Sequence, residues 1–286
     1  MGRVTAPGPK GPLSLPVGVA DLIRCSVTER RQGVAYCLMT SLPTDSDVHS
    51  AARRLRASLV TPGLGRAVAA YFREPSFAGM TFTDLGQNPP CEIIADDLLA
   101  VSLLDITWRS QVVRIVLVSH KRELSSLLSA IPQDVDLWDA SDEELRSIDM
   151  MWDALTSIEG IGTASATKLL ARKRPRICPI SDSLVIKVVD VPGRTWDVLR
   201  CLLQDPAART EVEGLRPAQA KDASLLRILD VALWVSHSKS AAAQEVREKA
   251  RLRGPWSDLS ALVGHAPSGF EQLVVSDSDR TRRHHV

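Results

Sequence analysis

Apolar residues recur every three or four positions along most of the chain, the spacing of helices that bury one face. The segment 224–236 is apolar on most sides and is typical of a helix inside a core. Only the β-branched run 112–118 also suits a strand. The pattern therefore predicts a mainly α protein. The expected helices cover 48–59, 65–72, 97–104, 112–117, 123–131, 142–158, 224–236 and 244–251, with a further short helix after Asp182.

The two ends of the chain lack this periodicity. Residues 1–16 are rich in proline and glycine, and residues 276–286 are polar throughout. We therefore expect a disordered lead and a loose tail. Between them the pattern predicts an N-terminal helical extension over 17–65 and one larger domain over 66–265.

Composition and charge limit the kinds of protein that this chain can be. The apolar share of 44% and charged share of 24% are ordinary for a globular chain. The formal net charge is +1, so any surface that attracts an acidic partner has to be local. No apolar run is long enough for a membrane span, and the five scattered cysteines form no C-x-x-C pair. We expect a soluble bacterial protein of the cytoplasm with reduced thiols, no disulfide scaffold and no zinc site.

Residues 158–173 read IEGIGTASATKLLARK, where one expected helix ends and another begins. Gly160 and Gly162 allow a tight reversal in which the backbone approaches another molecule closely, with Ile161 turned inward between the helices. The first turn of the second helix presents unpaired N–H groups and the positive end of its dipole. That combination suits a DNA phosphate, although a glycine pair also occurs in plain helix–helix turns.

Asp182 follows a proline-containing loop and precedes a short apolar helix. It stands at an N-cap position, so capping explains it as readily as catalysis does. The surrounding segment 164–194 holds seven basic residues and two acidic ones. A local excess of positive charge beside a phosphate-binding turn is typical of a DNA contact, and a solvated basic loop is the other interpretation.

The string IEGIGTASA followed by ISDS resembles the helix-hairpin-helix, loop and aspartate of the HhH-GPD superfamily of DNA glycosylases. That superfamily includes endonuclease III and the 3-methyladenine glycosylases. The close match covers residues 158–183, and residues 80–106 and 224–234 more loosely resemble a divergent, actinobacterial-type branch. The resemblance implies the helix-hairpin-helix glycosylase fold, with two helical subdomains and a cleft between them. It places the hairpin at 156–173 and the catalytic loop at 174–183.

The resemblance also implies an activity, which is the flipping of a damaged or modified base and hydrolysis of its N-glycosidic bond. Asp182 would be the catalytic carboxylate. The implied partner is double-stranded DNA carrying such a base, bound by a monomer. No cofactor is required, but backbone carbonyls of Thr156, Ile158 and Ile161 would hold Na⁺ or K⁺. The expected phosphate contacts are Gly160, Gly162, Ala164, Lys168, Arg172 and Lys173.

Two positions depart from the superfamily pattern. Ala164 stands where bifunctional members carry a Schiff-base lysine, which implies a monofunctional enzyme that does not cut the strand. Lys168 lies one turn further along the same helix and is an alternative for such a role. Glu159 replaces the usual proline, and a carboxylate there is unfavourable beside a phosphate. No four-cysteine group follows the core, so no iron–sulfur cluster is expected.

The sequence says little about which base is released. Trp152 is the first candidate for a wall of the base pocket, although large aromatic residues more often fill cores. The base could be alkylated, oxidised, deaminated or phage-modified, so repair and antiviral defence both stay open. Two other functions also stay open: a hairpin DNA-binding protein without catalysis, which Glu159 favours, and an all-α protein interaction domain. Further candidates for contacts to the base are Trp108, Trp138, Trp196, Asp96, Asp97 and Asp105.

Overall fold

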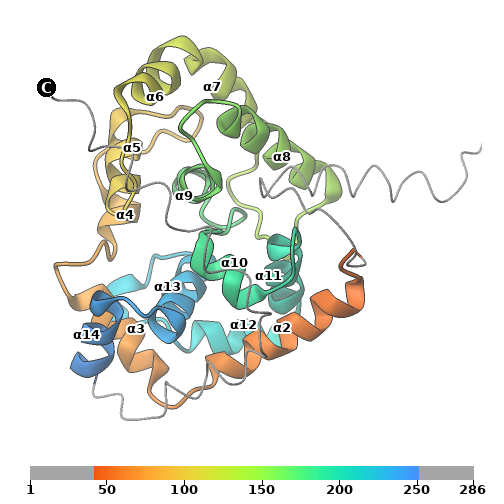
Figure 1. The fold of residues 1–286 in the computed structure, drawn as a ribbon, viewed down its shortest axis with the longest axis vertical. Helices are drawn as coiled ribbons and strands as arrows, with labels where there is room; N and C mark the ends of the chain where they lie inside the picture. The colour runs from red at the N-terminus through yellow and green to blue at the C-terminus, as the bar shows by residue number, and fades with distance from the viewer. Residues whose placement is uncertain (1–41, 251–286) are drawn as a thin grey trace, which may run out of the picture.

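The computed structural model describes residues 42–250, and every regular element in that part of the chain is helical (Figure 1). The prediction of a mainly α fold is therefore confirmed. The predictions for 1–16, for 276–286 and for the first part of 17–65 lie outside the described residues.

None of the helices within 42–250 has both the length and the apolarity to cross a membrane. The elements are α2 (Asp45–Leu59), α3 (Leu64–Arg73), α4 (Thr81–Asp84), α5 (Ala95–Ser102), α6 (Ser110–Arg114), η1 (Ile115–Ser119), α7 (Lys121–Ser129), α8 (Asp142–Thr156), α9 (Thr163–Lys173), α10 (Ser183–Val189), α11 (Thr195–Gln204), α12 (Pro206–Glu213), η2 (Ala218–Ala220), α13 (Leu225–His237) and α14 (Ala241–Lys249).

The β-branched run at 112–118 is helical and not a strand. Helix α6 continues directly into η1, a single π-helical turn. Val112 and Val116, four residues apart, are both about 1% exposed, so the run buries one helical face. Packing of that face overrides the local preference of valine and isoleucine for strands.

Buried apolar side chains form two clusters. The terminal cluster is built from α2, α3 and α10–α14, with Leu137 as its contribution from the middle of the chain. The central cluster is built from the continuous segment between Ala78 and Cys178. The two occupy the lower and upper halves of the view in Figure 1. The chain crosses between them before Ala78 and again between Cys178 and Val185, and Asp182 lies in this second crossing.

Helix α2 is an integral part of the terminal cluster and not a separate extension. It packs along α11 and buries Val48, Ala51 and Leu55 there. The guanidinium of Arg56 also pairs with Asp205 and Glu211, at 2.6 Å each. The predicted boundary at residue 65 therefore does not separate α2 from the rest of the fold, because its apolar face needs α11 to be covered.

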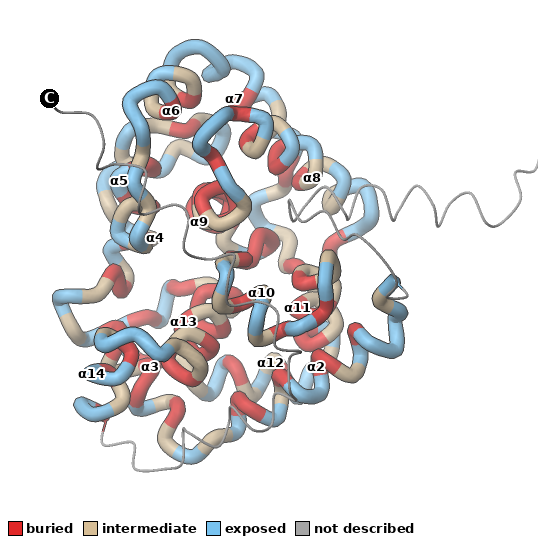
Figure 2. The backbone as a smooth tube through the Cα atoms, in the orientation of Figure 1, coloured by how far each residue is buried: buried red, intermediate tan, exposed pale blue. Residues whose placement is uncertain are grey.

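Helix α9 runs through the middle of the central cluster, and most of its residues are buried (Figure 2). Its C-terminal end carries the buried cations Arg172 and Lys173, which share one fully buried carboxylate, that of Asp97 on α5. The Asp97 oxygens lie 3.3 Å from Nε of Arg172 and 2.9 Å from Nζ of Lys173. Burial lowers the pKa of Lys173, and Asp97 opposes that shift. This ion group fixes α9 against α5, which positions the start of α9 as well.

Candidate functional site at the crossing between the clusters

The turn between α8 and α9 is a hairpin in which one glycine is required by its conformation. Helix α8 begins with the expected cap, as Ser141 and Glu144 bond each other's backbone N–H groups. Gly160 has φ +96°, and a Cβ there would lie 3.0 Å from Cγ2 of Val112. Gly162 has φ −95°, and a Cβ there would meet nothing within 4 Å. Ile161 is buried, as expected, and anchors the hairpin in the apolar core. The backbone of the turn around it stays exposed.

We expect Gly160→Ala to destabilise the fold by about 1–3 kcal/mol, because a residue with a Cβ is strained at this positive φ. The Val112 methyl must also move. Urea unfolding of the full chain measures the loss. Gly162→Ser is the matched control, since serine is a good N-cap and meets open space. An equal loss in both variants would show that the turn tolerates no side chain at all.

The first turn of α9 has fewer unpaired N–H groups for a phosphate than the sequence predicts. The N–H of Gly162 donates to Oγ of Ser165 at 3.0 Å, so that donor is already used. The N–H groups of Gly160 and Ala164 meet no acceptor among the described residues. These two unpaired donors are the candidates for binding an anion at the hairpin.

The prediction that Arg172 and Lys173 contact a DNA phosphate is wrong. They are 2% and 5% exposed, and beyond Asp97 the Arg172 guanidinium donates to carbonyl oxygens of Phe82, Thr83 and Leu85. Nζ of Lys168 is also engaged, donating to the carbonyl oxygen of Leu104 at 2.8 Å. The charge excess in the sequence is therefore largely an interior feature, because long basic side chains can bury their stems when their charged ends find acceptors.

Asp182 is the N-cap of α10. Its Oδ1 accepts from the N–H groups of Leu184 and Val185, both at 3.0 Å, which confirms the capping interpretation. Its Oδ2 accepts no hydrogen bond from any described residue. The preceding residue is tied to the hairpin helix, because the N–H of Ser181 donates to Oγ1 of Thr167 at 3.1 Å. The carboxylate is thus fixed in the crossing with one oxygen available.

A second carboxylate, Asp230 on α13, lies close to Asp182. Burial raises the pKa of Asp230, and the negative charge of Asp182 raises it further. The positive charges of Arg227 and Lys168 oppose this rise. Asp230 pairs with Arg227 at 2.5 Å, and α10 packs against α13 (Figure 1). The sequence analysis did not identify the pair of Arg227 and Asp230. Two opposite charges three residues apart in an otherwise apolar helix were the available signal.

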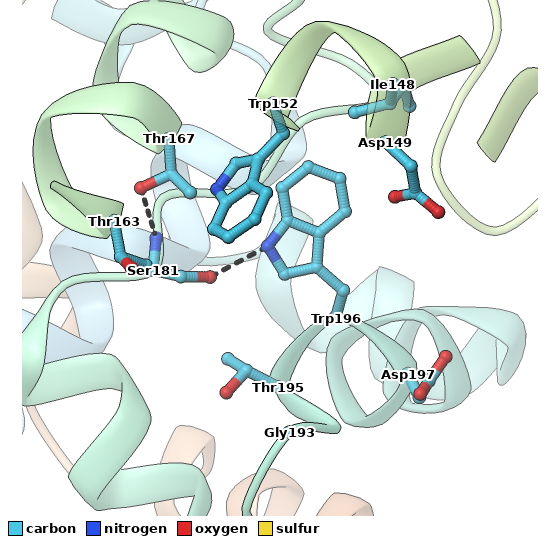
Figure 3. A pocket seen from close by; sticks show the side chains of 10 residues that line it. All are labelled: Ile148, Asp149, Trp152, Thr163, Thr167, Ser181, Gly193, Thr195, Trp196 and Asp197. Atoms are coloured by element: carbon cyan, nitrogen blue, oxygen red, sulfur yellow. Dashed lines mark hydrogen bonds between the residues drawn. The ribbon is translucent and has the colours of Figure 1, made fainter. Parts of the chain in front are cut away.

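A cavity of about 80 Å³ lies on the other side of the same loop, between α8, α9 and α11 (Figure 3). The indoles of Trp152 and Trp196 lie side by side in its wall, and Nε1 of Trp196 donates to Oγ of Ser181 at 2.8 Å. Such a volume holds about two or three waters. Trp152 therefore lines a cavity next to the loop, and its contact with a flipped base stays a prediction. The full lining is Ile148, Asp149, Trp152, Thr163, Thr167, Ser181, Gly193, Thr195, Trp196 and Asp197.

Two other tryptophans predicted to contact the base, Trp108 and Trp138, lie elsewhere. Nε1 of Trp108 donates to the carbonyl oxygen of Leu98 at 2.8 Å, and the ring packs on the central cluster. Trp138 packs on the terminal cluster with the Arg209 guanidinium 5.4 Å from its ring centre. Neither lines the cavity beside Trp152, so the structure does not bring these three rings into one pocket.

The carbonyl groups predicted to hold Na⁺ or K⁺ belong to one turn. Thr156 is the last residue of α8, and the carbonyl oxygen of Ile158 accepts from the N–H of Ile161 at 3.0 Å. One lone pair of that oxygen remains for a cation, which stays a prediction. Within 42–250, no three His, Cys, Asp or Glu side chains lie together in a way that suits a metal ion.

Comparison with known proteins identifies a family for most of the described chain. A family model described as a family of unknown function, DUF6308, matches residues 65–237. The match runs from α3 to the end of α13, so it includes the hairpin, Asp182 and Asp230, and leaves out α2 and α14. No curated protein and no solved structure matches the chain.

Proposed function

The chain belongs to the DUF6308 family of unknown function, and for this member we propose the activity of a monofunctional DNA glycosylase. Such an enzyme flips a damaged or modified base out of duplex DNA and hydrolyses its N-glycosidic bond, leaving an abasic site. One observation supports this above the others. Asp182 is held in the crossing between the two clusters, tied through Ser181 and Thr167 to the hairpin helix, with Oδ2 available.

The chemistry follows from the charge that develops when the glycosidic bond breaks. The sugar becomes positively charged, and a carboxylate fixed nearby stabilises that charge. Oδ1 of Asp182 is occupied by two backbone N–H groups, which hold the side chain in one orientation. Oδ2 faces the reacting sugar and orients or deprotonates the attacking water. The backbone of the hairpin, through Gly160 and Ala164, grips a phosphate and sets the register of the DNA.

We expect Gly162→Asp to weaken binding to all DNA sequences alike, because it adds a negative charge beside the phosphate site. The fold should be retained, since aspartate is a preferred N-cap and a Cβ here meets open space. Fluorescence anisotropy against salt concentration measures the change, with Gly162→Ser as the uncharged control. Unchanged affinity in the aspartate variant would remove the hairpin from the DNA contact.

The proposal is tested by base release from duplexes with alkylated, oxidised, deaminated or phage-modified bases, assayed with and without alkali. Strand breaks that appear only after alkali support a monofunctional glycosylase, and the duplex that is cut identifies its base as a lesion or a phage modification. Breaks without alkali would overturn the monofunctional assignment and direct attention to Lys168. No release from any duplex would overturn the proposal.

A hairpin DNA-binding protein without catalysis is the second candidate. The exposed carboxylate of Glu159 beside Gly160 favours it, because this charge disturbs the close phosphate grip that catalysis requires. It predicts salt-sensitive DNA binding with no release from any member of the same panel.

A further inference from the structure

Helix α13 carries a buried ion pair on its side toward the crossing. Nη1 of Arg227 lies 2.5 Å from Oδ2 of Asp230, and Nη2 donates to the hydroxyl of Tyr71 at 2.9 Å. The Arg227 side chain is 6% exposed and that of Asp230 is 15% exposed. Oδ1 of Asp230 accepts no hydrogen bond from the described residues. This oxygen is the part of the pair that another molecule can reach.

The space beside this pair is incompletely filled, and its walls are mostly apolar. Arg227 and Asp230 line a cavity of about 20 Å³ whose opposite wall includes Cys178 and Ile180, from the loop that leads to Asp182. Nε of Arg227 is buried and has no hydrogen-bond partner there. A cavity of this size holds a single water, and a buried donor without a partner is unfavourable without one. The pair therefore does not pack tightly against the loop.

Asp230 also belongs to the same electrostatic environment as the proposed chemistry. The charges of Asp182 and Lys168 both act on its carboxyl group, so all three side chains lie near the crossing. Since Arg227 donates directly to Oδ2, we take the carboxyl group of Asp230 as ionised, with Oδ1 acting as a hydrogen-bond acceptor. That acceptor lies on α13, which packs against α10, the helix that Asp182 caps.

We propose that Asp230 determines which base is released, by accepting a hydrogen bond from an exocyclic amine of the flipped base. This inference rests on the proposed function and names its substrate class. An amine presents N–H donors to Oδ1, whereas the carbonyl of a deaminated counterpart presents lone pairs that a carboxylate repels. The enzyme therefore selects modified adenine- or cytosine-type bases over the oxo bases that carry the same modification.

The test compares the base that the wild type releases fastest with its amino or oxo counterpart, for example 5-hydroxymethylcytosine with 5-hydroxymethyluracil. We expect a preference of about 10- to 100-fold for the amino base in single-turnover release. In Asp230→Asn, the amide oxygen keeps the Arg227 bond and the NH₂ group replaces Oδ1. The preference should then fall at least about tenfold and shift toward the oxo base.

Asp149→Asn is the matched control, because Asp149 lines the tryptophan cavity instead. It should leave the amino-to-oxo ratio unchanged. A ratio that changes in Asp149→Asn and not in Asp230→Asn would overturn the inference and place the base between Trp152 and Trp196. If Asp230→Asn only loses stability, the amino-to-oxo preference of the wild type is the deciding measurement. A best substrate without an exocyclic amine would overturn the inference. These outcomes leave the proposed function standing, whereas no release from any duplex overturns both.

Discussion

Asp182→Asn is expected to lower the rate of base release by at least about 100- to 1,000-fold, the effect of removing one fixed electrostatic group from a transition state. Asparagine caps a helix as well as aspartate does, so the bonds from Leu184 and Val185 should persist. The variant therefore loses the charge and keeps α10. Single-turnover release from the best duplex of the panel measures the rate, and anisotropy should show nearly unchanged DNA binding.

Asp205→Asn is the control that matches this change in chemistry and position. Asp205 is the N-cap of α12, where its Oδ1 accepts from the N–H of Ala207 at 2.9 Å. It lies at the junction of α11 and α12, where it pairs with Arg56 of α2, so its charge should not affect the rate. A wild-type rate in Asp182→Asn would leave capping as the whole role of Asp182.

Asp97→Ala is expected to cost about 3–5 kcal/mol of the free energy of unfolding, the usual loss when one partner of a buried ion group is removed. Arg172 and Lys173 are both almost fully buried, and Asp97 is the carboxylate that pairs with them. Carbonyl oxygens and Oδ1 of Asn88 would remain as acceptors, but none carries charge. Urea unfolding followed by circular dichroism measures the loss.

Asp136→Ala gives the comparison for a surface pair. Asp136 pairs with Arg176 at 2.5 Å, and the Arg176 side chain is 46% exposed. Solvent-exposed pairs contribute about 0–1 kcal/mol, so this variant should remain close to the wild type. If Asp97→Ala lost no more than Asp136→Ala, the carbonyl groups around Arg172 would be sufficient to hold the end of α9.

Local rules predicted the parts of the site that are local in sequence. The hairpin, the cap of α8 and the position of Asp182 all follow from residues within a few positions of one another. Helices α11 and α12 were not expected, although Asp205 followed by Pro206 is a usual helix start. In α11 the spacing of Val198, Leu199, Leu202 and Leu203 was a further signal, whereas α12 has few apolar residues.

The parts that failed depend on contacts between distant residues. Arg172 finds Asp97 at a separation of 75 residues, so composition around the hairpin could not reveal that this cation is buried. Asp230 lies 48 residues beyond Asp182 and reaches the crossing only because α13 packs on α10. Sequence spacing identifies which residues are charged, whereas the tertiary fold decides which of them meet solvent.

The terminal cluster combines helices that precede the central segment in the chain with helices that follow it. This order has a consequence for folding during synthesis on the ribosome. Arg56 of α2 and Glu211 of α12 are 155 residues apart in the chain, and α11, which covers α2, comes only slightly earlier. At roughly 5 to 20 residues per second, translation takes roughly 8 to 30 s to cover that separation. During this interval the apolar face of α2 has emerged and its partners have not been made. The central segment can collapse first, and the nascent chain needs protection from association until α11 appears.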